Sequence, residues 1–201
     1  MGSGAAVPAI YWRPAMAYIR GGDVDEKEYP PFREVQQAFG FVPNFYKAQM
    51  LRPDLVESHI PWVGNLLVKE GALERRQKEY IFLVCSAANM STYCVTAHCE
   101  IVRMLGIHGP EPERLAIDPM HADIPVADKA LLAFALKLNK EPRKVDAEDI
   151  EELRTYGFDD AHILEAILMV GLAHYANIVA FGLGTVPDFD SARVEPLLAG
   201  R

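Results

Sequence analysis

Cysteine is scarce in this chain. Three of the 201 residues are cysteine, and they are not spaced as pairs. An odd number without paired spacing argues against the disulfide framework of a small secreted protein. Residues 1–6 also lack the basic stretch and long apolar core of a secretion signal. We therefore expect a cytoplasmic protein.

Several common functional motifs are missing as well. The sequence contains no G-x-G-x-x-G after a strand, no G-x-x-x-x-G-K-[ST] loop and no G-x-S-x-G elbow. Nucleotide cofactors and serine hydrolase chemistry are therefore unsupported, and we expect no cofactor. The formal net charge of −8 would repel the phosphates of nucleic acids and anionic membrane surfaces. Neither nucleic acid nor a membrane is an expected partner.

What the chain has is enough apolar sequence for one core. Half of its residues are hydrophobic, and proline and glycine separate stretches with helical periodicity. We predict an all-α domain over residues 29–187, a lead-in over 1–28 and a C-terminal tail over 188–201. Residues 107–125 carry four prolines and are expected to be a linker. The predicted helices are 32–39, 43–50, 53–67, 74–88, 92–105, 127–139, 146–156 and 160–182.

The last predicted helix is apolar on nearly all sides. Its length would suffice to cross a membrane, but Glu165, His174 and Asn177 would make that costly. We interpret it as a core helix or a subunit interface. Gly171 and Gly182 would allow close helix packing, which fits a homo-oligomer.

The helices at 74–88 and 92–105 are predicted to form a central antiparallel hairpin. Cys94 and His98 lie four residues apart on the second helix, so their side chains can meet. Ser91 is a good N-cap, which places Cys94 in the first turn, where the helix dipole favours a thiolate. Because Glu79 and His98 lie about equally far from the turn, Glu79 could orient His98. Alternatively, Glu79 is an exposed member of the charged run 74–79.

This pattern resembles a known family. Four residues at fixed spacing are typical of AhpD-like alkylhydroperoxidases, in the carboxymuconolactone decarboxylase superfamily. They are a glutamate, a cysteine twelve residues later, a second cysteine three residues after the first, and a histidine four residues after the second cysteine. Here the four positions are Glu79, Ser91, Cys94 and His98. The resemblance covers about residues 30–187 and extends to the peroxidase-related subgroup. Residues that share it are Tyr93, Ala97, Gly106 and the segments 43–45, 52–55, 130–138 and 156–158.

The resemblance implies an AhpD-like helical bundle and a homo-oligomer. In the family the second cysteine attacks peroxide, and the two cysteines then form a disulfide that a partner reduces. Ser91 stands at the first cysteine position and cannot form that disulfide. A possible sulfenic acid at Cys94 would therefore need another reductant. An external thiol or a neighbouring subunit is favoured over Cys85, and Cys99 points away from Cys94 on the same helix.

Structural interpretations of these residues stay open. Cys94 could be a small hydrophobic core residue, as we expect for Cys85 and Cys99. Ser91 is favoured as a simple N-cap, although its hydroxyl could also bond a Cys94 thiolate. A zinc site from Cys94, His98 and Cys99 fails because Cys94 and Cys99 face different ways and no second ligand pair stands at a suitable spacing, so no metal is expected.

Three further residues could line a pocket at this site. They are Tyr93, His174 and Asn177. For His174 a hydrogen-bonded core histidine is the favoured interpretation.

The leading functional hypothesis is a peroxidase-type oxidoreductase for antioxidant defence. His98, positioned by Glu79, would keep Cys94 as a thiolate that attacks a small hydroperoxide, and a thiol would reduce the product. The second hypothesis is acid/base chemistry of the lactone decarboxylase type, in which Glu79 and His98 act and Cys94 is dispensable. The third is a non-catalytic scaffold that lost its function with Ser91.

Overall fold

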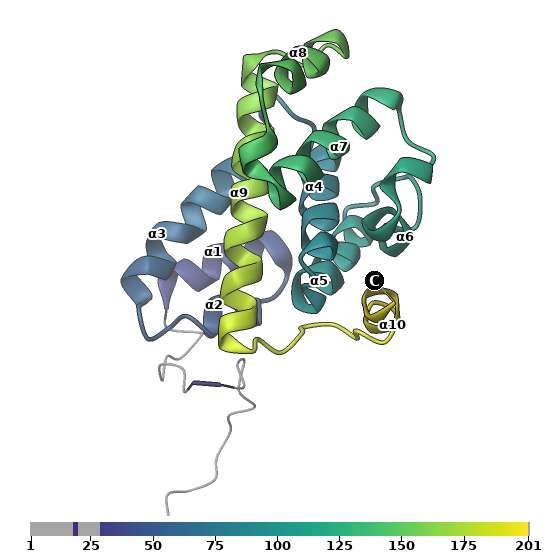
Figure 1. The fold of residues 1–201 in the computed structure, drawn as a ribbon. Coiled ribbons are helices and arrows are strands. Elements are labelled where there is room, and N and C mark those ends of the chain that lie inside the picture. Colours follow the sequence, from purple (N-terminus) through teal and green to yellow (C-terminus); the bar gives the residue numbers. More distant parts are fainter. Residues whose placement is uncertain (1–17, 20–28, 201) are drawn as a thin grey trace, which may run out of the picture.

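The structure is a computed structural model that describes Tyr18, Ile19 and residues 29–200. Most of the predicted lead-in, and the signal considered at residues 1–6, lie outside these residues. Within the described part every regular element is a helix, which confirms the all-α prediction (Figure 1). In chain order the elements are α1 (Pro30–Phe39), α2 (Asn44–Lys47), α3 (Pro53–Val63), the π-helical turn η1 (Gly64–Val68), α4 (Arg75–Ala88), α5 (Thr92–Met104), α6 (Pro112–Ile117), the 3₁₀ turn η2 (Pro119–His121), α7 (Val126–Lys140), the 3₁₀ turn η3 (Pro142–Lys144), α8 (Ala147–Thr155), α9 (Asp160–Leu183) and α10 (Glu195–Ala199).

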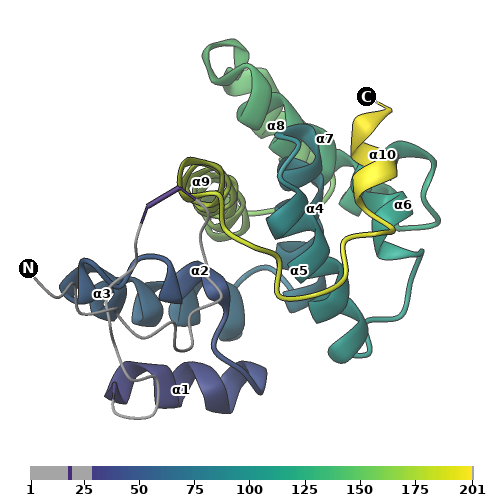
Figure 2. The same cartoon turned by 90° about the horizontal axis from the view of Figure 1, so that it is seen from below.

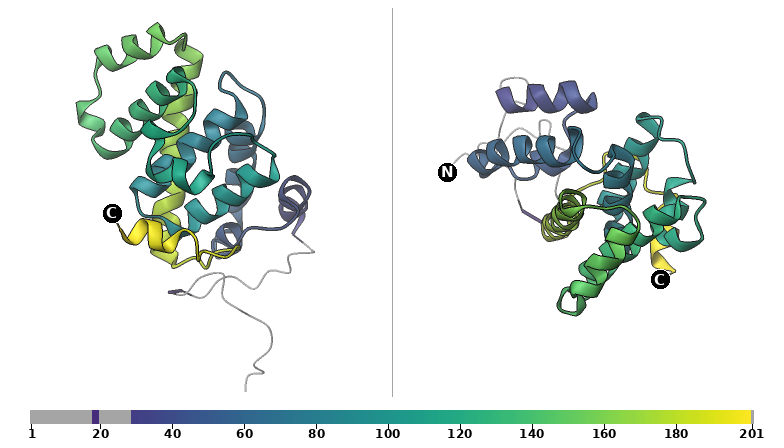
Figure 3. Two further views of the ribbon diagram at one scale, coloured as in Figure 1. Left: turned by 90° about the vertical axis from the view of Figure 1, so that its right-hand side faces the viewer. Right: turned by 90° about the horizontal axis from the view of Figure 1, so that it is seen from above.

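Two groups of helices lie beside α9 and also meet each other directly. Helices α1, α2 and α3 lie on one side of it, and α4 to α7 lie on the other (Figures 2 and 3). Helix α4 is the most enclosed, because it packs against α5, α6, α7 and α9 at once. Its nearly continuous apolar run, residues 80–85, fits this position, since a helix surrounded by others needs apolar residues on every side.

Helices α4 and α5 form the predicted antiparallel hairpin. Met90 ends α4 in the left-handed conformation, with a φ of 62°. Ser91 N–H donates to the carbonyl of Ser86 at 2.9 Å, and Met90 N–H donates to that of Ala87 at 3.0 Å. These two bonds satisfy carbonyls that the last turn of α4 would otherwise leave unpaired. The hairpin turn is thus fixed by its own backbone.

Helix α9 has two different apolar faces. Its first turn is capped by Asp159, whose side chain accepts from two backbone N–H groups, and residues such as Ala166 and Met169 are completely buried. By length and composition α9 could cross a membrane, but 44% of its most apolar window is buried inside the fold. On the outer face Leu164 and Ile178 are 56% and 59% exposed. The homo-oligomer expected from the sequence stays a prediction, and this face fits it.

The predicted linker at residues 107–125 is wrong in part. It contains α6 and η2, and α6 buries Leu115 and Ala116 against the hairpin. Pro112 and Pro119 each stand in the first turn of their helix, where a missing N–H costs nothing. Proline therefore starts helices in this segment.

The segment after residue 187 is structured as well. Val194 directly precedes α10 and Leu198 lies within it. Both belong to a core cluster with Leu83 and Val95 of the hairpin. Two earlier helices are shorter than expected, because α2 ends at Lys47 and α3 becomes the π-helical turn after Val63. The predicted helix at 146–156 is present as α8, and a capping box formed by Asp146 and Asp149 starts it.

Candidate active site

The hairpin brings a carboxylate to an imidazole. Glu79 of α4 is completely buried and His98 of α5 nearly so. Nδ1 of His98 lies 2.6 Å from Oε2 of Glu79. The prediction that these residues lie at the same depth is confirmed, and the alternative of an exposed Glu79 is wrong.

Arg75 completes the surroundings of Glu79. Its guanidinium contacts Oε1 of Glu79, with Nη2 at 2.6 Å and Nε at 2.8 Å. Burial alone would raise the pKa of the Glu79 carboxyl, but His98 and Arg75 outweigh it and hold the pKa below its usual value. Because an ionised carboxylate only accepts hydrogen bonds, Nδ1 of His98 carries the proton between them.

Phe82 holds the plane of the His98 ring. The two rings are stacked, with centroids 3.7 Å apart and planes 18° from parallel. The Glu79 bond fixes one nitrogen and the stacking fixes the ring plane. Nε2 is therefore the nitrogen of His98 that is left for a reacting proton.

Replacing Glu79 by glutamine is expected to lower the free energy of unfolding by about 3 kcal/mol near neutral pH. The native pKa of Glu79 lies below its usual value of 4.5, so its contribution is present above that pH and is lost as the pH falls. Urea unfolding from about pH 7 to about pH 3 should show the two proteins converging in acid. The exposed Glu70→Gln is the control. An equal difference at every pH would contradict the assignment.

Cys94 lies in the first turn of α5, as predicted, but it is a thiol at neutral pH. It is 3% exposed, and burial raises its pKa to about 11 although hydrogen bonds from Ser91 and Asn177 lower it. Within the described residues no hydrogen bond joins Cys94 to His98. The prediction that His98 holds a resting thiolate is wrong, because burial favours the neutral thiol and no hydrogen bond from His98 offsets it.

Ser91 occupies the N-cap position of α5 without capping it. Its hydroxyl makes no hydrogen bond to the backbone of the first turn. The side chain is buried and bonds Cys94. The favoured interpretation as a simple cap is thus corrected, and the contact with the sulfur is the one that the structure has.

Asn177 of α9 reaches Cys94 from the opposite helix. Its amide donates to Oγ of Ser86 at 2.9 Å and accepts from Asn89 at 2.9 Å, so the hairpin turn fixes its orientation. His174 is different. It is exposed and so is not a core residue, although its Nδ1 has a hydrogen-bond partner, Oδ1 of Asn139, at 3.3 Å. It does not line the cavity beside Cys94, so its predicted place in the pocket is wrong.

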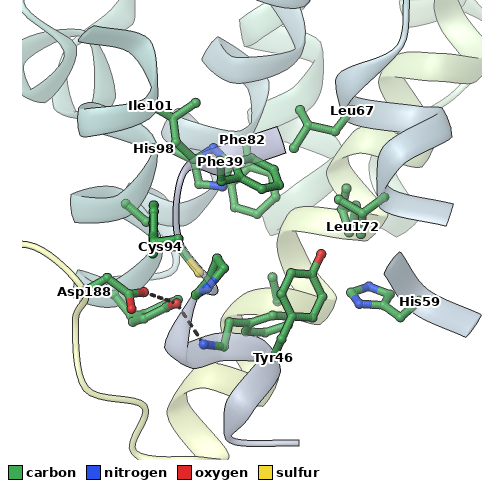
Figure 4. Close-up of a pocket in the computed structure, with 17 residues that line it drawn as sticks. Phe39, Tyr46, His59, Leu67, Phe82, Cys94, His98, Ile101, Leu172 and Asp188 are labelled. Atoms are coloured by element: carbon green, nitrogen blue, oxygen red, sulfur yellow. Dashed lines mark hydrogen bonds between the residues drawn. The ribbon is translucent and has the colours of Figure 1, made fainter. Parts of the chain in front are cut away.

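A cavity of about 90 Å³ adjoins Cys94 and His98 (Figure 4). Residues from α1, α2, α3, η1, α4, α5 and α9 line it, together with the segment before α2 and the segment after α9. The lining is largely apolar, which favours an uncharged ligand. Its aromatic members are Phe39, Phe41, Phe45, Tyr46, Phe82 and Tyr93.

Tyr93 lines this cavity, as predicted, and joins three segments. Its hydroxyl donates to Asp188 at 2.6 Å and accepts from the backbone N–H of Phe45 at 2.9 Å. Asp188 also accepts from the backbone N–H of Asn44 at 2.9 Å. Burial raises the pKa of the Asp188 carboxyl above its usual value. The segment after α9 therefore closes one side of the cavity.

Sequence reasoning missed Asp188 and His59. Both line the cavity, but neither stands in a motif. Asp188 falls in the segment interpreted as a tail, and His59 falls in a predicted helix to which no functional motif was assigned. The spacing of the neighbouring residues carries no signal that could have identified them.

The other two cysteines lie in the core as free thiols. Burial raises the pKa of Cys85 to about 12 and that of Cys99 further. Cys99 belongs to the core cluster beneath α10, away from the cavity residues. Across the part of the chain that the structure describes, no group of three or more His, Cys, Asp or Glu residues could hold a metal ion.

Comparisons with known proteins identify the fold. No family model matches the chain, and no curated protein does. An uncharacterized peroxidase-related protein with an AhpD core, from Ralstonia eutropha JMP134, is 33% identical over 79% of this chain and 84% of that one, with a TM-score of 0.73.

Two other solved structures share the fold at lower identity. A peroxidase-related protein from Silicibacter sp. TM1040 is 24% identical, with 93% and 97% of the two chains covered and a TM-score of 0.79. The debrominase Bmp8 in complex with 2,3,4-tribromopyrrole is 20% identical, with 85% and 89% covered and a TM-score of 0.70. The identity with the Ralstonia protein, together with the shared helical architecture, identifies the family of this chain. The chain belongs to the AhpD-like, peroxidase-related protein family.

Proposed function

We propose that this protein is a peroxidase-type oxidoreductase that reduces small hydroperoxides through Cys94. One observation carries the proposal. A buried cysteine and a histidine oriented by a buried carboxylate line the same small apolar cavity. Such a cavity excludes bulk water and admits an uncharged peroxide.

In the proposed reaction the proton of the Cys94 thiol is transferred within the site. Nε2 of His98 takes the proton from Cys94 as the sulfur attacks the terminal oxygen of the hydroperoxide. The S–O bond forms, the O–O bond breaks, and the proton passes from His98 to the leaving alkoxide. The sulfur of Cys94 is oxidised to a sulfenic acid. The hydroperoxide is reduced to an alcohol, which leaves the cavity.

An external thiol then restores Cys94. Ser91 cannot resolve the sulfenic acid, and Cys85 and Cys99 are buried thiols with raised pKa values. A first thiol displaces water and forms a mixed disulfide with Cys94. A second thiol releases Cys94 and leaves as the disulfide of the two reductant molecules.

Sulfenic acid trapping tests the proposal. Purified protein is mixed with an organic hydroperoxide and dimedone, and intact mass and peptide mapping follow. We expect one adduct, at Cys94, and none in Cys94→Ser. Cys85→Ser is the matched control and should react like the wild type. Equal, slow labelling of all three cysteines would refute the proposal.

A second candidate function rests on the Glu79–His98 pair. The imidazole bonds the carboxylate and Cys94 is a neutral thiol, an arrangement that also suits proton transfer on a small acid of the lactone decarboxylase type. A structural neighbour is a debrominase, so this fold is used for other reactions too. Turnover that survives Cys94→Ser but not His98→Ala would favour this function. Absence of both turnover and trapping at Cys94 in the wild type would indicate a non-catalytic scaffold.

A further inference from the structure

His59 of α3 lines the cavity and has two unused hydrogen-bonding atoms. Both of its ring nitrogens are buried, and neither has a hydrogen-bond partner within the described part of the chain. Nearly all buried polar groups in proteins are paired, and an unpaired one costs about 1–3 kcal/mol. A histidine with both nitrogens unpaired beside a cavity therefore has a role that the fold does not explain.

Aromatic rings surround His59. The ring of Tyr175 lies 4.9 Å from it, that of Trp62 5.7 Å, that of Phe45 5.9 Å and that of Tyr46 6.0 Å, measured between centroids. Burial lowers the pKa of His59, which favours the neutral imidazole. A neutral imidazole offers one donor and one acceptor. It can therefore bond a hydroxyl or a carbonyl on a ligand.

Figure 4 shows His59 and Cys94 in the same cavity. His59 stands at one side of the cavity and Cys94 at the other, with Tyr46 between them in this view. The aromatic residues that line the cavity offer flat apolar surfaces on which a ring can stack. A cavity of about 90 Å³ leaves little room for a long acyl chain.

We propose that His59 is a specificity-determining residue that hydrogen-bonds a polar group on a compact, ring-bearing ligand, whose other end faces Cys94. For catalysis, this role of His59 rests on the proposed function. The substrates would then be small aryl hydroperoxides with a hydroxyl or carbonyl opposite the peroxide. The binding itself is a property of the cavity and is tested without any reaction.

Phenol and toluene form a matched pair of probes, because they share one shape and differ in a hydroxyl against a methyl group. Their dissociation constants are measured by NMR titration in the wild type, in His59→Phe and in the control Ser58→Ala. We expect His59→Phe to reduce the preference for phenol about three- to tenfold, the effect of one neutral hydrogen bond. Ser58→Ala should leave the preference unchanged, and His59→Gln should retain most of it.

Two results would overturn the inference. One is an unchanged ratio of the two dissociation constants in His59→Phe, and the other is failure of both probes to shift signals of cavity residues. The same titration in Cys94→Ser separates binding from chemistry. Phenol preference without trapping at Cys94 would refute the peroxidase proposal alone, and trapping without phenol preference would refute the role of His59 alone.

Discussion

Replacing His98 by alanine is expected to slow the oxidation of Cys94 by a hydroperoxide about 10²- to 10⁴-fold near neutral pH. The reason lies in the state of the sulfur. With a pKa of about 11, Cys94 is almost entirely a thiol at that pH, so the proton must leave during the attack. Nε2 of His98 is the group assigned to take it. Stopped-flow mixing with a sulfenic acid trap measures the rate constant directly.

Two variants keep this result interpretable. The exposed His121→Ala removes a histidine far from the cavity and should react like the wild type. His98→Gln preserves volume beside Phe82 and a donor toward Glu79, so it separates loss of the base from loss of packing. Added imidazole should restore part of the rate in His98→Ala. A rate within about threefold of the wild type in both His98 variants would remove His98 from the mechanism.

In the His98→Ala variant, the remaining rate is expected to rise about tenfold for each pH unit between about pH 7 and about pH 10. Without the imidazole only the preformed thiolate reacts, and its fraction grows tenfold per unit below the pKa of about 11. Burial raises the pKa of Cys94, and the hydrogen bonds from Ser91 and Asn177, which lower it in part, are left in place by this substitution. The wild type should depend on pH much less, since His98 takes the proton inside the site.

The difference in oxidation rate between His98→Ala and the wild type should therefore become smaller as the pH rises. Pre-steady-state pH jumps measure both proteins before alkaline unfolding, and the Cys94→Ser/His98→Ala double variant gives the background. A rate that levels off near pH 8 would mean that Cys94 is a far stronger acid than its burial implies. The proposed proton transfer to His98 would then be unnecessary.

The Glu79–His98 contact was predictable from the sequence for a definite reason. Both residues lie on regular helices that meet at a short turn, so counting residues outward gives their depth. The capping box at Asp146 was predictable on similar grounds, because its parts are three residues apart. Local patterns of this kind determine helix ends and helix pairs.

The state of Cys94 could not be predicted in this way. Spacing of four residues brings two side chains near one another, but the rotamer of His98 depends on Glu79 and Phe82 of the other helix. The pKa of Cys94 depends on how completely distant elements cover it, including Asn177 of α9. His59 and Asp188 were missed because their roles arise only from the packing of segments far apart in the chain.

The bond between Tyr93 and Asp188 also has a consequence for biosynthesis. The two residues are 95 positions apart, so a ribosome completes the hairpin long before it makes the residue that closes the cavity. Until Asp188 is made, the cavity beside Cys94 lacks one of its sides. The site around the thiol is therefore completed only when synthesis of the chain is nearly finished.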